Sequence, residues 1–254
     1  ITSDGKFLYG IYIDNDKKNC LFVNNFDGTH FVDITPPNNT FAYIYGSNAD
    51  GTSLYGNYNS NNIYSGFFIN TNGTGFIGIT PQGAKGSYIV TISPDGTKAL
   101  GNFLDHNGQM HAFITKLDGS GFADLTPVGS TQSQILGITQ EGTRAWGQFN
   151  DQNDQLHYFI IKLDGTGFVD LTLQGSTQSS VGGITPDGAK AWGFFLDQND
   201  QSHPFITKLD GTGFIDLTPI NATTTNLGGI TPDGKLFGTY QTADQKWHGF
   251  TYQT

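Results

Sequence analysis

The residues from Gly183 to Pro219, GITPDGAKAWGFFLDQNDQSHPFITKLDGTGFIDLTP, return in whole or in part six times along the chain. Each return is marked by an Asp-Gly pair, once Glu-Gly, and these pairs begin at residues 4, 50, 95, 141, 187 and 233. The intervals are therefore 46, 45, 46, 46 and 46 residues. A fixed period of this length indicates an array of supersecondary units that share one core. We expect residues 1–254 to form a single domain.

Turn residues divide each repeat into four short strands, a to d. Strand a ends in Gly-Ile-Thr, and a Pro-Asp-Gly turn leads into strand b, the Ala-Trp-Gly run. Strand c begins at His, and an Asp-Gly-Thr-Gly turn leads into strand d. The b–c hairpin occurs six times, whereas strand d starts five times, at Phe31, Phe76, Phe122, Phe168 and Phe214. This count predicts an all-β fold, a six-bladed β-propeller of four-stranded blades of about 46 residues, with incomplete first and last blades.

Composition narrows the classes of function. The formal net charge of -10 disfavours nucleic acid and anionic membrane surfaces as partners. No apolar run is long enough to cross a membrane, so we expect no membrane insertion. The chain has one cysteine, Cys20, and is rich in Asn, Gln, Thr and Gly. This composition is typical of secreted, cell-surface or periplasmic proteins of bacteria, and we expect that localisation.

Three motifs carry a resemblance to known families. Residues 184–188 (ITPDG), 209–214 (LDGTGF) and 216–219 (DLTP) resemble the WD40-like repeat of TolB-type propellers. Strand c, with His111-Ala112-Phe113, resembles the bacterial extracellular repeat named for His-Ala-Phe. Together the two resemblances cover nearly the whole chain. They imply binding and scaffolding, and the TolB-type propellers are protein-interaction modules.

Four recurring side chains have a structural interpretation. The strand b glycines predict close packing of one blade on the next, and the bulky residues before them predict an inter-blade core, although Trp or Tyr could also stack on a sugar. The histidines that open strand c predict hydrogen bonds to a neighbouring loop, because ligands on separate blades cannot converge on a metal ion. The hydroxyl that ends strand a is expected to cap its own turn. The strand b glycines are Gly10, Gly56, Gly101, Gly147, Gly193 and Gly238, and the bulky residues before them are Tyr9, Tyr55, Leu100, Trp146, Trp192 and Phe237. The histidines that open strand c are His111, His157, His203 and His248. The hydroxyl residues that end strand a are Thr2, Ser93, Thr139, Thr185 and Thr231, with Asn48 in the second repeat.

The b–c and d–a loops are longer and more variable than the Asp-Gly turns, as expected of a binding face on a rigid scaffold. Their carboxylates, amides and hydroxyls suit sugar hydroxyls or a protein surface. Asp-x-Asn spacing also permits Ca²⁺, but no loop has the full calcium-binding pattern, so no cofactor and no metal are expected. The predicted ligand-binding residues are Asp105, Asn107, Asp151, Asn153, Asp154, Asp197, Asn199, Asp200, Ser130, Gln132, Ser176 and Gln178.

Catalytic motifs are missing from the sequence. There is no Gly-x-Ser-x-Gly, His-Glu-x-x-His, phosphate loop or Cys-x-x-Cys. Residues that break the repeat, such as His30, Glu141 and Arg144, form no evident acid/base pair. The sequence therefore predicts a non-catalytic binding module with a protein or glycan partner. A multivalent glycan-binding lectin is the first alternative, and a glycoside hydrolase or polysaccharide lyase is the second.

Overall fold

A computed structural model describes residues 1–173, 176 and 178–254. Every regular element in these residues is a β-strand, and the strands form antiparallel sheets. The chain divides into two compact units, residues 1–126 with 132–138 and residues 127–131 with 139–254, and each unit is described by itself. A single domain over residues 1–254 stays a prediction.

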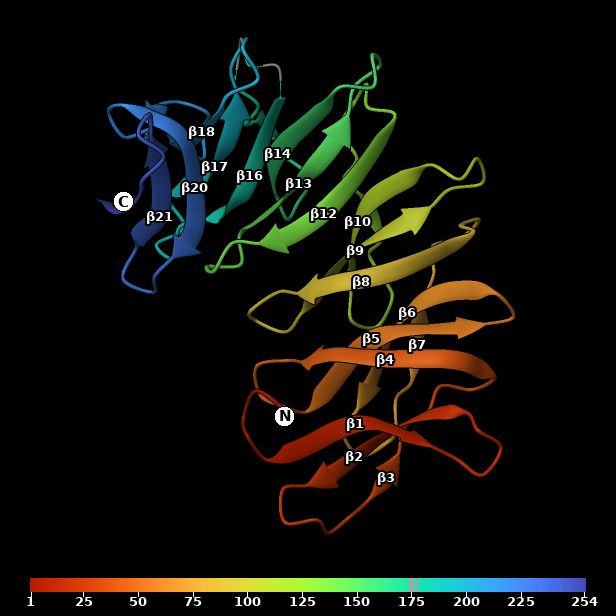
Figure 1. Ribbon diagram of the computed structural model, residues 1–254. Coiled ribbons are helices and arrows are strands. Elements are labelled where there is room, and N and C mark those ends of the chain that lie inside the picture. Colours follow the sequence, from red (N-terminus) through yellow and green to blue (C-terminus); the bar gives the residue numbers. More distant parts are fainter. Residues whose placement is uncertain (174–175, 177) are drawn as a thin grey trace. The chain divides into compact units, whose positions relative to one another are not determined.

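The first unit contains twelve strands (Figure 1). Its first sheet lacks a strand a, because residues 1–6 form no strand before β1. The elements are β1 (Phe7–Ile13), β2 (Asn19–Asn25), β3 (Val32–Asp33), β4 (Asn39–Ser47), β5 (Ser53–Ser60), β6 (Ile63–Asn70), β7 (Ile77–Ile79), β8 (Gly86–Ile92), β9 (Lys98–Leu104), β10 (Met110–Lys116), β11 (Ala123–Asp124) and β12 (Gln132–Ile138).

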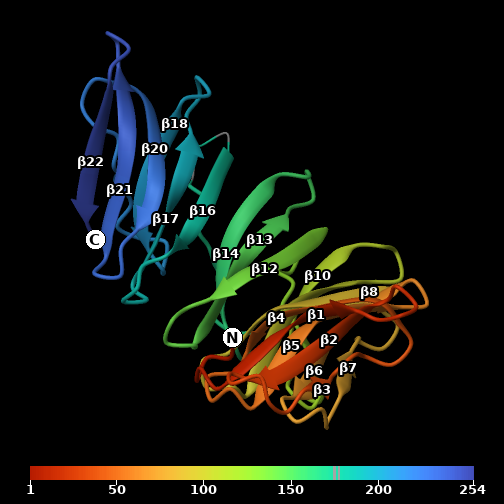
Figure 2. The same ribbon diagram turned by 60° about the horizontal axis from the view of Figure 1, so that its bottom comes forward.

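The second unit contains the remaining strands, and Figure 2 shows β20, β21 and β22 side by side as its last sheet. That sheet has no strand d. The elements are β13 (Arg144–Asn150), β14 (Leu156–Lys162), β15 (Val169–Asp170), β16 (Gln178–Ile184), β17 (Lys190–Leu196), β18 (Ser202–Lys208), β19 (Ile215–Asp216), β20 (Ala222–Ile230), β21 (Lys235–Thr242) and β22 (Trp247–Gln253).

The sheets confirm the predicted blade count. There are six, each made of strands that are consecutive in the chain, and four of them have four strands while the first and last have three. Blades 1 to 6 begin at β1, β4, β8, β12, β16 and β20. The short outer strands β3, β7, β11, β15 and β19 each begin one residue after the predicted Phe. Four-stranded antiparallel sheets repeated along a chain are the architecture of a β-propeller.

The Asp-Gly turns form as their chemistry dictates. In the a–b turn of blade 5, the Gly188 amide donates to the Thr185 carbonyl at 2.8 Å, and Gly188 has φ of 70°. The Thr185 hydroxyl donates to Asp187 at 2.5 Å and accepts the Lys190 amide at 3.0 Å. The same arrangement occurs at Thr2, Ser93 and Thr231, and a carboxamide replaces the hydroxyl at Asn48. The predicted capping role of this residue is confirmed.

The strand b glycines are tightly packed, but their nearest neighbours differ from those predicted. A Cβ at Gly101 would lie 2.2 Å from the Tyr88 carbonyl oxygen and 2.8 Å from the Phe113 ring. Both atoms belong to strands a and c of the same blade. The prediction of close packing is therefore right, but the predicted neighbour, the next blade, is wrong. The register explains the crowding, because strand a has a β-bulge opposite the glycine, between Ile89 and Thr91. The bulge turns a carbonyl toward strand b, and only hydrogen fits beneath it.

The core lies between successive blades within each unit. Tyr9 packs on a cluster from blades 1 and 2, and Tyr55 on one from blades 2 and 3. In the second unit, Trp146 and Trp192 pack in the same way on clusters from blades 4 and 5 and from blades 5 and 6. The predicted inter-blade role of these bulky residues is confirmed. Phe237, on the last blade, is 41% exposed because no later blade packs on it.

Candidate ligand-binding site

The carboxylates of the b–c loops stabilise the loops themselves. Asp151 Oδ1 accepts the amides of Asn153 and Gln155, both at 2.8 Å. These two bonds close a tight turn, and they hold the pKa of Asp151 below its usual range, the Gln155 amide contributing most. Asp105 and Asp197 accept the equivalent pairs of amides in blades 3 and 5. One oxygen of Asp105, Asp151 and Asp197 is therefore committed to backbone.

The histidines that open strand c fasten the outer part of the blade. His157 Nδ1 lies 2.9 Å from Asp170 on β15, and its ring stacks on Phe149 with centroids 4.9 Å apart. His111 and His203 bond instead to Thr126 and Thr218, at 3.1 and 2.9 Å. The predicted structural role is confirmed: the partner is the last residue of strand d, Asp170, or a threonine in the loop that follows strand d. Among the described residues, no group of three or more His, Cys, Asp or Glu side chains has the arrangement of a metal site.

The other predicted residues fall into two groups. Asn107, Asn153 and Asn199 place their side-chain amides 3.2, 3.3 and 3.4 Å from the carboxylate of their own loop. Ser130 and Ser176 donate to carbonyl oxygens three residues earlier, at 2.6 and 2.7 Å.

Seven of the predicted residues are exposed: Asn107, Gln132 at the start of β12, Asn153, Asp154, Gln178, Asn199 and Asp200. Asp200 has the left-handed φ of 59°. The predicted d–a loop 175–179 includes residues 175 and 177, which, with 174, lie outside the described residues.

One cavity brings together predicted residues from two loops. It has a volume of about 290 Å³ and is lined by Asp154 of the b–c loop and by Ser176 and Gln178 of the d–a connection, with His157 and Thr172 beside them. Asp154 accepts a hydrogen bond from Asn150 at 2.8 Å. The predicted b–c loop residues of blades 3 and 5 are not among the residues that line this cavity.

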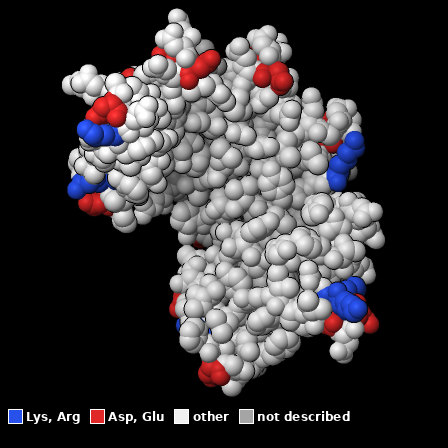
Figure 3. All heavy atoms as spheres, viewed as in Figure 1, with Lys and Arg blue, Asp and Glu red and all other residues white. Residues whose placement is uncertain are grey.

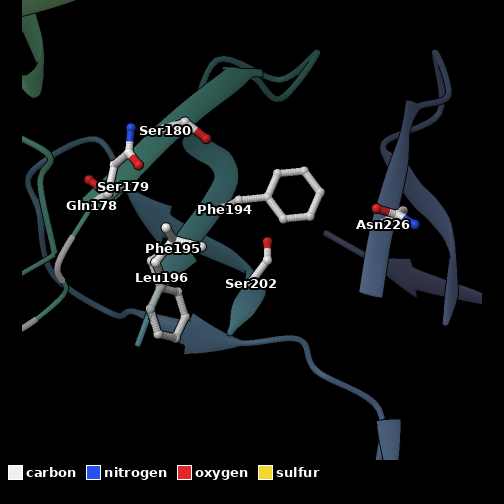
Figure 4. A pocket seen from close by; sticks show the side chains of 8 residues that line it. All are labelled: Gln178, Ser179, Ser180, Phe194, Phe195, Leu196, Ser202 and Asn226. Atoms are coloured by element: carbon white, nitrogen blue, oxygen red, sulfur yellow. The ribbon is translucent and has the colours of Figure 1, made fainter. Parts of the chain in front are cut away.

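A second cavity, of about 350 Å³, shares Gln178 with the first and lies between blades 5 and 6 (Figure 4). Its walls are residues 178–180 of β16, residues 194–196 of β17, Ser202 of β18 and Asn226 of β20. In Figure 4 the Phe194 ring projects into the space between Ser180 and Asn226. None of the described residues that line it is Asp, Glu, Lys, Arg or His. Gln178 belongs to the predicted ligand-binding residues, and the predicted b–c and d–a loops, residues 196–202 and 175–179, also reach Ser179, Leu196 and Ser202. Sequence reasoning missed Ser180, Phe194, Phe195 and Asn226.

The cavity exists because blade 5 departs from the repeat. In blades 2 and 3 the residue after the strand b glycine is Asn57 or Asn102, and it faces a tyrosine on strand a, Tyr43 or Tyr88. Asn102 Oδ1 accepts the Ile135 amide at 2.7 Å, and its Nδ2 donates to the Ile135 carbonyl at 3.3 Å.

This amide clamp fastens blade 3 to strand a of the next blade, within the first unit. In blade 5 the same cross-strand pair is Ser180 opposite Phe194. Phenylalanine has no polar group with which to bond blade 6, and serine is too small to fill the space. The signal in the sequence was an aromatic residue at a position that holds an amide in blades 2, 3 and 4, as Asn57, Asn102 and Gln148, and Ile11 and Thr239 in blades 1 and 6.

Glu141 and Arg144, which also break the repeat, lie at the opposite ends of the strands, beside the Asp-Gly turns. They line a cavity of about 460 Å³ together with Lys190, Lys208 and Asp210. Glu141 accepts the Thr143 hydroxyl at 3.1 Å, and its carboxylate covers Gly188 of the next blade. Glu141 is therefore a turn residue, as its place in the repeat suggests. On the face seen in Figure 3, charged side chains gather at loops and turns and leave the surface over the strands largely uncharged.

Comparison with known proteins supports the fold. No family model and no curated protein matches the sequence. Among solved structures, a putative TolB from Agrobacterium tumefaciens is similar with a TM-score of 0.51 and 15% identity, over 83% of this chain and 80% of that one. TolB from Acinetobacter baumannii is similar with a TM-score of 0.51 and 13% identity, over 98% of this chain and 64% of that one. An oligogalacturonate lyase in complex with manganese gives 0.59 and 11%, over 98% and 74%.

These likenesses establish the class of fold. The chain is a six-bladed β-propeller similar to the propellers of TolB proteins, as the repeat motifs indicate. At such low identity the similarity to a lyase concerns the fold alone. The resemblance of strand c to the His-Ala-Phe repeat stays a prediction. None of the described residues belongs to a helix of the length and hydropathy that a membrane crossing needs.

Proposed function

We propose that this protein is a non-catalytic binding module whose ligand meets the b–c and d–a loop edge of blades 4 to 6, in the second unit. One observation carries the proposal: two adjoining cavities open at this edge and share Gln178. Both are lined mainly by hydroxyl, amide and aromatic groups, which recognise a ligand without reacting with it. TolB-like propellers are a precedent for interaction modules on this fold, and the partner here is a protein or a glycan.

The state of the carboxylates supports binding over catalysis. A glycosidase requires two carboxyl groups that flank a bond, one of them free to donate a proton. Here the loop carboxylates Asp105, Asp151 and Asp197 hold backbone amides, which favours their ionised form and weakens them as acids. None of the described residues that line the cavity between blades 5 and 6 has a carboxylate. The adjoining cavity has one, Asp154. These features favour a binding module over a carbohydrate-active enzyme, which requires a pair of carboxyl groups.

The environment that suits this function is the cell exterior or the bacterial periplasm. The surface is acidic, with a net charge of -10, and Cys20 is a buried free thiol. Neither feature requires a cofactor or a nucleic-acid partner. We place the module among secreted, surface or periplasmic proteins on this basis.

The test uses a matched pair of variants. Gln178→Ala alters both cavities, whereas Gln140→Ala removes the same exposed side chain at an Asp-Gly turn at the other ends of the strands. Wild type and variants are applied to a glycan array and a protein array, and reducing-sugar release is measured on the same polysaccharides. We expect binding in one array that falls in Gln178→Ala, persists in Gln140→Ala and comes without sugar release. Release of sugar, equal loss in both variants, or no binding in either array contradicts the proposal.

A further inference from the structure

We infer that the cavity between blades 5 and 6 binds a neutral glycosyl unit, with an apolar face of the sugar ring stacked on Phe194 and its hydroxyls bonded to serine and amide side chains. This inference rests on the proposed function and names its ligand class. It depends on four features: the origin of the cavity, the ring of Phe194, the hydroxyl and amide groups of the wall, and the absence of charge among the described residues that line it.

The cavity replaces an inter-blade contact that blades 2 and 3 have. In these two blades the tyrosine is on strand a and the amide on strand b, and the amide bonds to the next blade. Blade 5 has the reverse order, with a small polar residue on strand a and the aromatic ring on strand b, as Ser180 and Phe194. Loss of this contact forgoes stability, because a buried carboxamide that bonds the next blade stabilises the pair of blades. Such a local departure from a stabilising pattern marks a functional position.

Phe194 presents its ring to the cavity. Its neighbour Phe195 is packed against His203, Phe205 and Phe214, with ring centroids 4.9, 6.4 and 5.5 Å away. Phe194 makes no such ring contact in the part of the chain that the structure describes, and it points into the space seen in Figure 4. An aromatic face beside polar groups suits a ligand with one apolar and one polar side. A pyranose ring has this character, since its C–H groups gather on one face and its hydroxyls lie at the rim.

The polar groups around Phe194 suit hydroxyls. Ser180, Ser202, Gln178 and Asn226 line the wall beside its ring. Ser179 also borders the cavity, but it lies opposite Phe195 in the register and so turns its side chain to the other face of the strand. Serine hydroxyls and carboxamides both donate and accept, as do the hydroxyls of a sugar.

The absence of ionisable groups from the wall selects a neutral ligand. A phosphate or uronate would leave its charge in a cavity without a cation, at a desolvation cost that nothing offsets. The volume of about 350 Å³ lies at the lower end of the range for small-molecule sites, which fits one or two sugar units. The cavity opens beside the loops, so a longer glycan chain can extend from it into solvent.

The experiment measures the binding of defined sugars by saturation-transfer-difference NMR. The probes are methyl β-glucoside, methyl β-galactoside, methyl α-mannoside and their tetrasaccharides, with methyl β-glucuronide as the charged counterpart. We expect at least one neutral probe to bind better than the glucuronide. Phe194→Ala should weaken it about tenfold, which corresponds to about 1.4 kcal/mol, and Asn226→Ala should weaken it to a smaller degree. Tyr64→Ala, which removes an exposed ring in the first unit, should have no effect.

Phe194→Asn gives a second readout that does not depend on the probe. It gives blade 5 the asparagine that blades 2 and 3 have at this position. The backbone that this asparagine would bond is that of Leu227, which lies immediately before the bulge of β20 and corresponds to Ile89 and Ile135. We expect this variant to raise the midpoint of thermal unfolding while it abolishes sugar binding. A merely structural Phe194 would instead lower the midpoint when replaced by a polar residue.

Several results would overturn the inference. These are equal sugar binding by Phe194→Ala and wild type, preference for the glucuronide, or a lower midpoint in Phe194→Asn. If no neutral sugar binds, but a protein ligand is captured and lost in Gln178→Ala, the glycan inference fails and the proposed function stands. If neither binds, both fail.

Discussion

Asn102→Ala tests the amide clamp, which bonds blade 3 to the next blade and is missing at the cavity between blades 5 and 6. Asn102 is 1% exposed, and its carboxamide makes two hydrogen bonds to the backbone of Ile135 on the next blade, at 2.7 and 3.3 Å. Ile135 is also 1% exposed, so no water can replace the lost partner without entering the core. The substitution removes both bonds and leaves a buried amide and carbonyl unpaired.

The expected loss follows from these two groups. A buried backbone group left without a partner costs about 1–3 kcal/mol, and the longer of the two bonds contributes the smaller part. We therefore expect Asn102→Ala to lower the free energy of unfolding by about 2–4 kcal/mol. For a domain of this size, that loss lowers the melting temperature by roughly 5–15 °C. Asn57 bonds to Ile89 through one contact of 2.9 Å, so Asn57→Ala should lose about half as much.

Two measurements check the magnitude and the location. Urea unfolding followed by far-ultraviolet circular dichroism gives the free energy of unfolding, and amide hydrogen exchange reports on Ile135 itself. The exchange protection of the Ile135 amide should fall in Asn102→Ala and stay unchanged in Asn57→Ala. Asn107→Ala removes an exposed amide from the b–c loop of the same blade and should change the free energy by less than about 0.5 kcal/mol.

A loss below about 1 kcal/mol, with the Ile135 amide still protected, would refute the reasoning. It would mean that blade-to-blade packing alone holds strand a in place. The cavity beside Phe194 could then no longer be explained by the absence of a clamp.

Three further predictions follow from the turns and strands. Gly101→Ala places a Cβ 2.2 Å from a carbonyl oxygen and should abolish soluble expression or cost more than about 3 kcal/mol, whereas Gly249→Ala, whose nearest atom is 4.0 Å away, should be tolerated in the same urea titration. Asp200→Gly should stabilise the protein by about 0.5–1 kcal/mol in thermal unfolding, because its φ of 59° favours glycine; a destabilised variant would point to an unrecognised contact. The hydroxyls of Thr2 and Thr185 hold the pKa values of Asp4 and Asp187 below 3.8, that of Asp4 at about 2. The stabilisation by these two ionised carboxylates is thus fully present above pH 3.8 and is lost as the pH falls toward 2. The urea midpoint of unfolding should therefore drop over that window, and it should drop less steeply in Asp187→Asn. Equal dependence of the midpoint on pH in wild type and variant would contradict the assignment.

The sequence was informative wherever a residue acts within its own repeat. Thr185, Asp187 and Gly188 are neighbours in the chain, and the turn they form needs no information from elsewhere. The histidine before strand c was correctly interpreted as structural, because its partner Asp170 or Thr218 lies in the same blade. The strand b glycine was recognised as tightly packed, but its partner was misassigned, since the β-bulge of strand a leaves no mark in the composition of the strand.

The predicted ligand-binding site shows where reasoning from the sequence failed. Asp105, Asp151 and Asp197 were chosen as polar loop residues free to meet a ligand, yet each turns one oxygen toward its own backbone. Loop polarity alone cannot separate a carboxylate that closes a turn from one that faces solvent. The better indicator was the exception to the repeat at Phe194, which is visible in the sequence but has no meaning until its neighbours are known.

The sequence by itself determined the period, the strand order within a blade, the turn chemistry and the count of six blades, because each blade is built from the residues of one repeat and the repeats can be counted along the chain. The tertiary structure decided where a ligand can be met. Ser180, Phe194 and Asn226 come from two repeats, and they border one cavity only because the register sets Ser180 opposite Phe194 and packing brings β20 beside β18. A cavity is the absence of a contact between blades, and only the packed structure reveals which contact is missing.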